Sequence, residues 1–139
     1  MLQNVSPEVQ ATMNKVGIHL EFLGYEIKRN NEYANGLFAV HPEKTNISIK
    51  VFSRAVRFTA FYNSNYFARE NRQAFLEFVN ILNMNSIAAQ CSIDLEGTLV
   101  ITSFFLGTYD KVIFGQFIDL WHDDIQKIHN ADDVSDFFS

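Results

Sequence analysis

The side chains best suited to bind a metal ion are two histidines of the last predicted helix. His122 and His129 lie seven residues apart, and so on one helix face, with Asp119 three residues before His122. Two helical turns still separate the imidazoles by about 10 Å, at a rise of roughly 1.5 Å per residue. That is too far for one shared ion, and zinc usually takes ligands at tighter spacing. We interpret this face as solvated, predict no metal site, and assign the isolated His19 and His41 structural or surface roles.

Candidates for a nucleophile or an acid–base pair are no better placed. Cys91, the single cysteine, lies mid-strand on the face expected to be buried, where a thiol behaves as a small apolar group. Asp123 and Asp124 cannot both point inward, because neighbours on a helix face different ways. We interpret the six aspartates from Asp119 onward as an acidic surface. With no Gly-x-Ser-x-Gly motif and no glycine-rich phosphate loop, the sequence predicts neither catalytic residues nor a cofactor.

The first helix carries start and stop signals. Ser6 is suited to cap its N-terminus, Pro7 to occupy its first position and Gly24 to end it. Between them, apolar residues recur at spacings of three and four, which predicts one buried stripe. These residues are Val9, Met13, Val16, Leu20 and Leu23.

The residues after this helix alternate in polarity as strands do. Tyr25–Lys28 and Leu37–His41 are strand candidates, separated by a polar stretch that ends at Gly36. Ile47–Phe52 and Val56–Tyr62 follow, joined by a tight connection. Whether one or two strands precede Ile47 stays open at this point. Together these segments predict an antiparallel meander.

The second half contains a helix, a hairpin and a long last helix. Helical spacing begins near Phe67, and strand alternation then leads into a hairpin turn at Asp94–Gly97. Thr108 or Asp110 is suited to cap the last helix. The tail after His129 is acidic, and we expect it to be frayed.

These elements predict an α+β fold in one domain that covers residues 1–139. The expected order is α-β-β-β-α-β-β-α, with an antiparallel sheet of five to six strands and helices packed on one face. A chain of 139 residues is long enough to bury an ordinary core. We place the ordered core at about residues 6–129 and an acidic C-terminal tail at residues 130–139.

Charge and hydropathy narrow the range of partners. Sixteen acidic residues against 11 basic ones give a formal net charge of −5, which argues against nucleic acid or an anionic membrane as the partner. No apolar run approaches the roughly 20 residues of a membrane span, and the first ten residues lack the pattern of a signal peptide. One cysteine excludes an internal disulfide. The sequence therefore predicts a cytoplasmic protein.

The unusual feature is a surplus of apolar residues on the strands, in a chain with 14 phenylalanines. In a two-layer fold the outer face of the sheet should be polar, yet several strands carry large apolar residues on both faces. Either loops or the chain's own ends, such as Phe137 and Phe138, cover this face, or another protein chain does. The predicted interface residues are Phe52, Phe61, Val100, Phe104 and Leu106.

The order of the elements resembles that of type III secretion chaperones and of YbjN-like proteins. The local likeness lies in Leu23-Gly24-Tyr25 at the end of the first helix, in residues 78–83 at the end of the second, and in residues 94–99 at the hairpin. It covers about residues 6–128 and is strongest over residues 75–106. The resemblance implies a non-enzymatic protein that dimerises and binds or regulates other proteins.

Two functional hypotheses follow from these observations. The first is a dimeric protein-binding module, chaperone-like or regulatory, with a homodimer and a protein client as its partners. The alternative is a carrier of small apolar ligands that uses an aromatic-lined pocket. An enzyme is the third hypothesis and would need a cleft where aspartate, histidine and tyrosine side chains converge, which only a structure can show.

Overall fold

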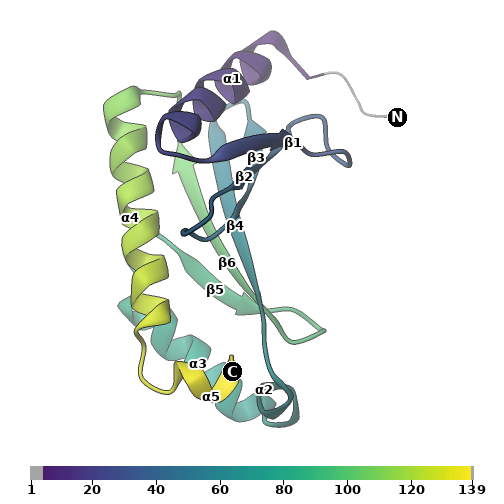
Figure 1. The fold of residues 1–139 in the computed structure, drawn as a ribbon, viewed down its shortest axis with the longest axis vertical. Helices are drawn as coiled ribbons and strands as arrows, with labels where there is room; N and C mark the ends of the chain where they lie inside the picture. Colours follow the sequence, from purple (N-terminus) through teal and green to yellow (C-terminus); the bar gives the residue numbers. More distant parts are fainter. Residues whose placement is uncertain (1–4, 139) are drawn as a thin grey trace. The chain divides into compact units, whose positions relative to one another are not determined.

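A computed structural model of the chain describes residues 5–138 (Figure 1). Residues 1–4 and 139, the outermost parts of the expected domain and of its acidic tail, lie outside this range. The elements are α1 (Pro7–Phe22), β1 (Glu26–Arg29), β2 (Gly36–Val40), β3 (Ile47–Phe52), β4 (Ala55–Asn63), α2 (Tyr66–Glu70), α3 (Arg72–Asn85), β5 (Gln90–Ile93), β6 (Thr98–Leu106), α4 (Lys111–His129) and α5 (Val134–Phe137).

The predicted α+β class and antiparallel sheet are confirmed. Six strands are paired in the order β1-β2-β3-β4-β6-β5. The structure also resolves the point left open before Ile47, because two strands, β1 and β2, precede it. The predicted order of helix, strands, helix, strand pair and helix is likewise observed.

By its internal contacts the chain divides into two compact units. Unit 1 comprises residues 1–59 and 104–116, and unit 2 comprises residues 60–103 and 117–139. The chain passes from one unit to the other within β4, β6 and α4. A single domain for the whole chain stays a prediction, and each unit is described by itself below.

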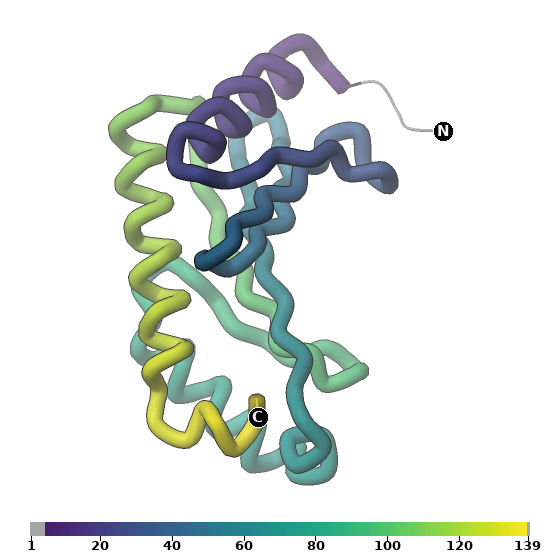
Figure 2. The backbone as a smooth tube through the Cα atoms, in the orientation of Figure 1, coloured from purple at the N-terminus to yellow at the C-terminus, as the bar shows by residue number. Residues whose placement is uncertain are grey.

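In unit 1, α1 packs on β1, β2 and β3 (Figure 2). The helix begins as predicted, because the Ser6 hydroxyl accepts a hydrogen bond from the Val9 N–H at 3.2 Å. It ends before Gly24, which adopts a φ of +96° that other residues rarely tolerate. The first part of α4 supplies Phe114, whose ring packs edge-on against those of Phe58 and Phe105. Helices therefore cover one face of the strands in this unit.

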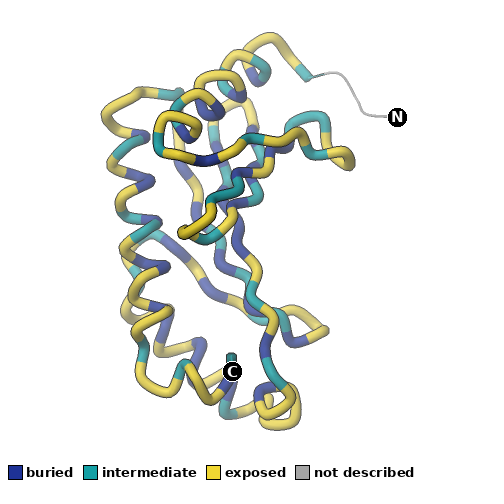
Figure 3. The backbone as a smooth tube through the Cα atoms, in the orientation of Figure 1, coloured by how far each residue is buried: buried dark blue, intermediate teal, exposed yellow. Residues whose placement is uncertain are grey.

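The strands of unit 1 show the expected alternation of buried and exposed residues (Figure 3). On β3, Ile47, Ile49 and Val51 are buried, whereas the side chains between them are half-buried or exposed. This period of two places successive side chains on opposite faces. The core of unit 1 therefore lies on the helix side, and the other face is turned outward.

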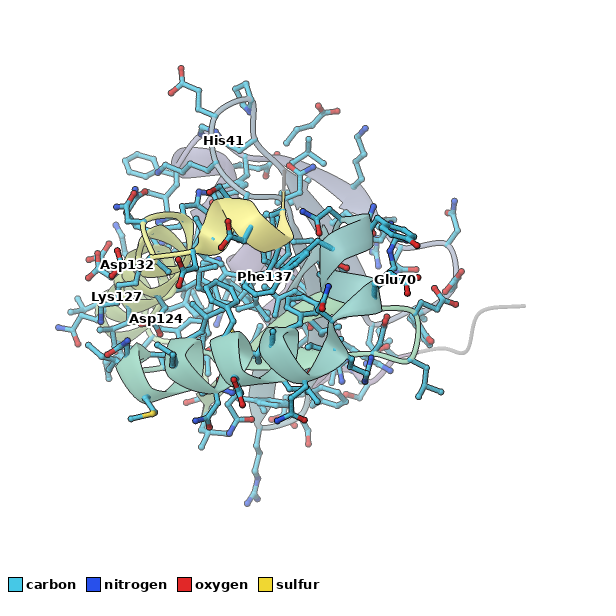
Figure 4. The ribbon with its side chains drawn as sticks, turned by 90° about the horizontal axis from the view of Figure 1, so that it is seen from below. His41, Glu70, Asp124, Lys127, Asp132 and Phe137 are labelled. Carbon is cyan, nitrogen blue, oxygen red and sulfur yellow. The ribbon has the colours of Figure 1, made fainter. Side chains whose placement is uncertain are left out.

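In unit 2, α3 packs on β5, and Trp121 of α4 is fully buried. The acidic tail was expected to be frayed, but residues 134–137 form the short helix α5. Phe137 is only 5% exposed, because its ring stacks on those of Phe75 and Phe78 on α3 (Figure 4). Burial of this one aromatic side chain gives the tail a defined position that its charged composition did not suggest.

Candidate protein interface

The outward sheet face of unit 1 carries four large apolar side chains. Phe104 and Leu106 on β6 are 50% and 77% exposed, and Phe52 on β3 is 38% exposed. These three residues were predicted at this face. Phe38 on β2 is 41% exposed and was missed, although it alternates with the buried Leu37 and Ala39 and the same period-two pattern could have found it.

A backbone hydrogen bond holds the end of β6 beside the turn that joins β3 and β4. The Gly107 N–H donates to the Arg54 carbonyl at 2.8 Å. Gly107 directly follows Leu106 at the end of β6, and Arg54 lies in the turn that follows Phe52 at the end of β3. The end of β6 is thereby held against the β3–β4 turn. Phe52 and Leu106 consequently border the same part of the outward face.

Two cations flank Phe52. Lys50 on β3 lies opposite Arg57 on β4, and each charged group lies just under 6 Å from the Phe52 ring centroid, at 5.8 Å and 5.9 Å. Lys50 also lies 4.2 Å above the ring of Tyr33. Within residues 5–138, no carboxylate lies within 4.0 Å of either cation. The outward face of unit 1 is therefore aromatic and cationic, although the whole chain is acidic.

The other two predicted interface residues belong to unit 2. Phe61 on β4 is 59% exposed. Val100 on β6 is half-buried and lies opposite the exposed Ser92 of β5. Val100 lies between the buried Leu99 and Ile101, and Phe61 follows the buried Ala60, so both side chains point away from the core of their unit. Among the described residues, Phe137 and Phe138 were one explanation for how this face is covered, but both rings pack against Phe75 and Phe78 on α3 instead.

The aspartate pair requires a correction. Asp123 is exposed, as expected, but Asp124 is fully buried and is no part of an acidic surface. Its carboxylate accepts hydrogen bonds from the backbone N–H groups of Ile87, Ala88 and Ala89, at 2.9, 2.7 and 2.8 Å. These contacts fix the chain between α3 and β5, so Asp124 has a structural role. No sequence pattern predicts this role, because the partners of Asp124 are backbone groups about 36 residues away.

The remaining candidate side chains also make local contacts. His19 lies 2.8 Å from the Tyr109 hydroxyl, and burial, together with the charge of Lys111, lowers the pKa of its imidazole. His129 lies 3.0 Å from the Tyr62 hydroxyl. Cys91 is buried, as predicted, and burial raises the pKa of its thiol to about 12. In the described part of the chain, no three histidine, cysteine or acidic side chains are grouped as a metal ion would require.

Two open hollows lie in unit 2. One has a volume of about 1240 Å³ and lies between α3 and the end of α4. The other, of about 380 Å³, is lined in part by Tyr62, Leu99 and Phe138. None of the five predicted interface residues lines either hollow. Across residues 5–138, no helix is both long and apolar enough to span a bilayer.

Comparison with known proteins identifies the fold. No protein-family model and no curated protein sequence matches the chain. Among solved structures it is similar to YbjN, a candidate transcription regulator from E. coli, with a TM-score of 0.71 and 11% identity over 91% of this chain and 95% of that one. The chain has a YbjN-like fold. The resemblance noted in the sequence is confirmed at the level of the fold.

The YbjN-like fold extends to a second known structure. The chain is also similar to a chain of the heterodimeric complex ExoU–SpcU from the type III secretion system of Pseudomonas aeruginosa. The TM-score is 0.55 and the identity 12%, over 81% of this chain and 93% of that chain. At such low identities the likeness concerns the fold, and function has to be argued from the surface itself.

Proposed function

We propose that this chain is a non-enzymatic protein-binding module, chaperone-like or regulatory, that acts as a dimer through the outward sheet face of unit 1. The observation that carries the proposal is the exposure of Phe104 and Leu106 at the end of β6, beside the β3–β4 turn that follows Phe52. Single exposed apolar residues are ordinary, whereas several on one sheet face are typical of an interaction site. Aromatic side chains accompanied by arginine are also enriched at protein interfaces.

A second copy of the chain is the occupant that we propose for this face. Two-fold contacts need a surface that is complementary to itself, and an apolar patch meets this condition. Phe104 and Leu106 would form the centre of the contact. Lys50 and Arg57 would repel their own copies, so we place them at the hydrated rim, where charges contribute little.

A client protein is the second partner that we propose. The ExoU–SpcU neighbour is a heterodimer, which supports protein partners for this fold. We propose the cytoplasm as the compartment, because the one cysteine is a free, buried thiol.

Size-exclusion chromatography with light scattering tests the dimer. The mass measured for wild type should be twice that of the monomer. The mass measured for Phe104→Glu should be that of the monomer, because the substitution would bury a charge in the contact. Phe22→Glu is the matched control: Phe22 is 87% exposed, lies on α1 of the same unit and should leave the dimer intact. A wild-type monomer, or a Phe104→Glu variant that remains dimeric, would overturn the proposal.

Phe61 and Val100 belong to the same proposal but need separate variants, because they lie in unit 2. Phe61→Ser and Val100→Ser each remove apolar surface without adding charge. If the interface extends to these residues, either change should weaken the dimer, and the dissociation constant from sedimentation equilibrium measures it. A dissociation constant equal to that of wild type would confine the interface to unit 1.

The alternative function is a carrier of small apolar ligands. Its support is the hollow of about 380 Å³ lined in part by Tyr62, Leu99 and Phe138, which falls in the size range of ligand pockets. Native mass spectrometry of the freshly purified protein should then show a bound small molecule, and Phe138→Ala should reduce its occupancy. A spectrum of the bare chain alone would count against this function.

A further inference from the structure

The larger groove of unit 2 exposes apolar surface. It lies between α3 and the end of α4 and has a volume of about 1240 Å³. Ile81 and Phe67 at its opening are 54% and 47% exposed. The groove is therefore open to a partner with apolar side chains. Its floor is formed by buried apolar residues, namely Phe78, Leu82, Ile128 and Phe137.

Carboxylates outnumber cations around this groove. Lys127 is the one lysine or arginine in its lining, and it is already engaged: its Nζ lies 3.7 Å from Asp124 Oδ1 and donates to the Asn85 carbonyl at 3.2 Å. Five further acidic residues line the groove, and all are exposed: Glu77, Asp123, Asp132, Asp133 and Asp136. Among the residues that the structure describes, no lysine, arginine or histidine nitrogen lies within 4.0 Å of these five carboxylates.

The wall formed by α5 is held in place by specific contacts. Asn65 donates two hydrogen bonds to the backbone of α5, from its N–H to the Phe137 carbonyl and from its Nδ2 to the Asp136 carbonyl, both at 2.8 Å. Asp133 turns the chain from α4 into α5 with a φ of +66°, a conformation that aspartate tolerates better than most residues. Figure 4 shows Phe137 between α5 and α3, with Lys127 and Asp132 to one side. The groove is thus formed before any partner arrives.

We propose that this groove binds a cationic amphipathic helix of another protein, with its apolar face on the groove floor and its lysine or arginine side chains against the five carboxylates. α3 has 14 residues, so it offers a wall about 21 Å long. In its described part, a second copy of this chain offers no such helix, because α1 and α3 each carry a single lysine or arginine and the two lysines of α4 are outnumbered by its three aspartates. Nucleic acids and anionic membranes carry negative charge, which the carboxylates of the groove would repel. The inference concerns a different surface and a different partner from the proposed dimer.

A pair of synthetic peptides tests the charge requirement. Each peptide has about 14 residues, enough to match α3, with leucine at helical spacing and either lysine or glutamate at all other positions. In fluorescence anisotropy the lysine peptide should bind wild type, and the glutamate peptide should not. Raising the salt from about 50 to about 500 mM should weaken binding, because the contacts are exposed ion pairs. Equal binding of the two peptides, or no binding of either, would overturn the proposal.

Matched variants test the location. Glu77→Gln combined with Asp132→Asn should lower the affinity for the lysine peptide by roughly fivefold or more, because two exposed ion pairs are lost. Glu8→Gln combined with Glu21→Gln removes the same charge from exposed positions of α1 and should change nothing. If both double variants weaken binding equally, the attraction is to net charge only and the groove is excluded as the site.

A second matched pair tests the apolar contribution. Ile81→Ser should weaken binding of the lysine peptide. Ile18→Ser, at a 66% exposed position of α1, should leave that binding unchanged. Circular dichroism melts of all variants verify that each remains folded. The outcome is independent of the light-scattering result for Phe104→Glu, so the two proposals stand or fall separately.

Discussion

The carboxamide of Asn83 on α3 binds both backbone polar groups of Cys91 on β5. The Cys91 N–H donates to Asn83 Oδ1 at 2.7 Å, and Asn83 Nδ2 donates to the Cys91 carbonyl at 2.9 Å. β5 is the last strand in the sheet order, so these groups lie on an edge. An unpaired edge can recruit another strand and start aggregation. The Asn83 side chain takes the place of a neighbouring strand at this residue.

Asn83→Ala should therefore destabilise the protein. Two backbone groups of Cys91 lose their partner, which should lower the free energy of unfolding by about 1–3 kcal/mol. Urea unfolding followed by circular dichroism measures the change. Asn80→Ala is the control, because Asn80 lies on the same helix and its Nδ2 only approaches the Met84 sulfur, at 3.8 Å. Equal midpoints for the two variants would contradict the role of Asn83.

Asp124→Asn should cost more stability than Asp123→Asn. The Asp124 carboxylate accepts three backbone hydrogen bonds, and an amide can no longer accept at both positions. We expect the free energy of unfolding to fall by about 2–3 kcal/mol for Asp124→Asn. Asp123 is exposed, so its variant should stay within about 0.5 kcal/mol of wild type. Chemical unfolding of both variants against wild type decides between these expectations.

Stability should fall at alkaline pH in a way that depends on Cys91. Burial, with the charge of Asp124 as a second cause, raises the pKa of this thiol from 9.0 to about 12. Between those values the unfolded chain releases the proton and the folded protein keeps it. The unfolded state then binds fewer protons, so the free energy of unfolding falls by up to about 1.4 kcal/mol per pH unit.

Unfolding of wild type and Cys91→Ala across this range isolates the thiol. Wild type should lose more stability than the variant between about pH 9 and about pH 11. Burial also raises the pKa of Tyr25 to about 12, but that residue is present in both proteins and its contribution cancels. Parallel losses in the two proteins would exclude the thiol as a cause.

Phe137→Ala should detach α5. Its ring stacks on Phe75 and Phe78 at centroid distances of 5.3 and 4.8 Å. Loss of a buried aromatic side chain should lower the free energy of unfolding by about 3 kcal/mol. Phe138→Ala should cost clearly less, because Phe138 is only half-buried. Hydrogen exchange should show faster exchange over residues 134–137 in the first variant alone.

Much of the fold could be predicted because its signals are local. Ser6 and Pro7 start α1, and Gly24 ends it, through conformational preferences of those residues themselves. The alternation of Ile47, Ile49 and Val51 likewise predicted which face of β3 is buried. The exposed positions of Phe52, Phe104 and Leu106 followed from the same period of two.

What the sequence by itself determined is the type of the main helices and strands, the side that the strands turn inward, and the apolar surplus on the outward side. The tertiary structure alone decided which polar residues are buried and which backbone groups they bind. Asp124 and Asn83 look like ordinary helix-surface residues, and only their distant backbone partners give them their roles. The same holds for Phe137, because the aromatic rings that receive it lie about 60 residues earlier in the chain. Hydrogen bonding and packing between distant segments depend on where the chain returns, and no local pattern encodes that.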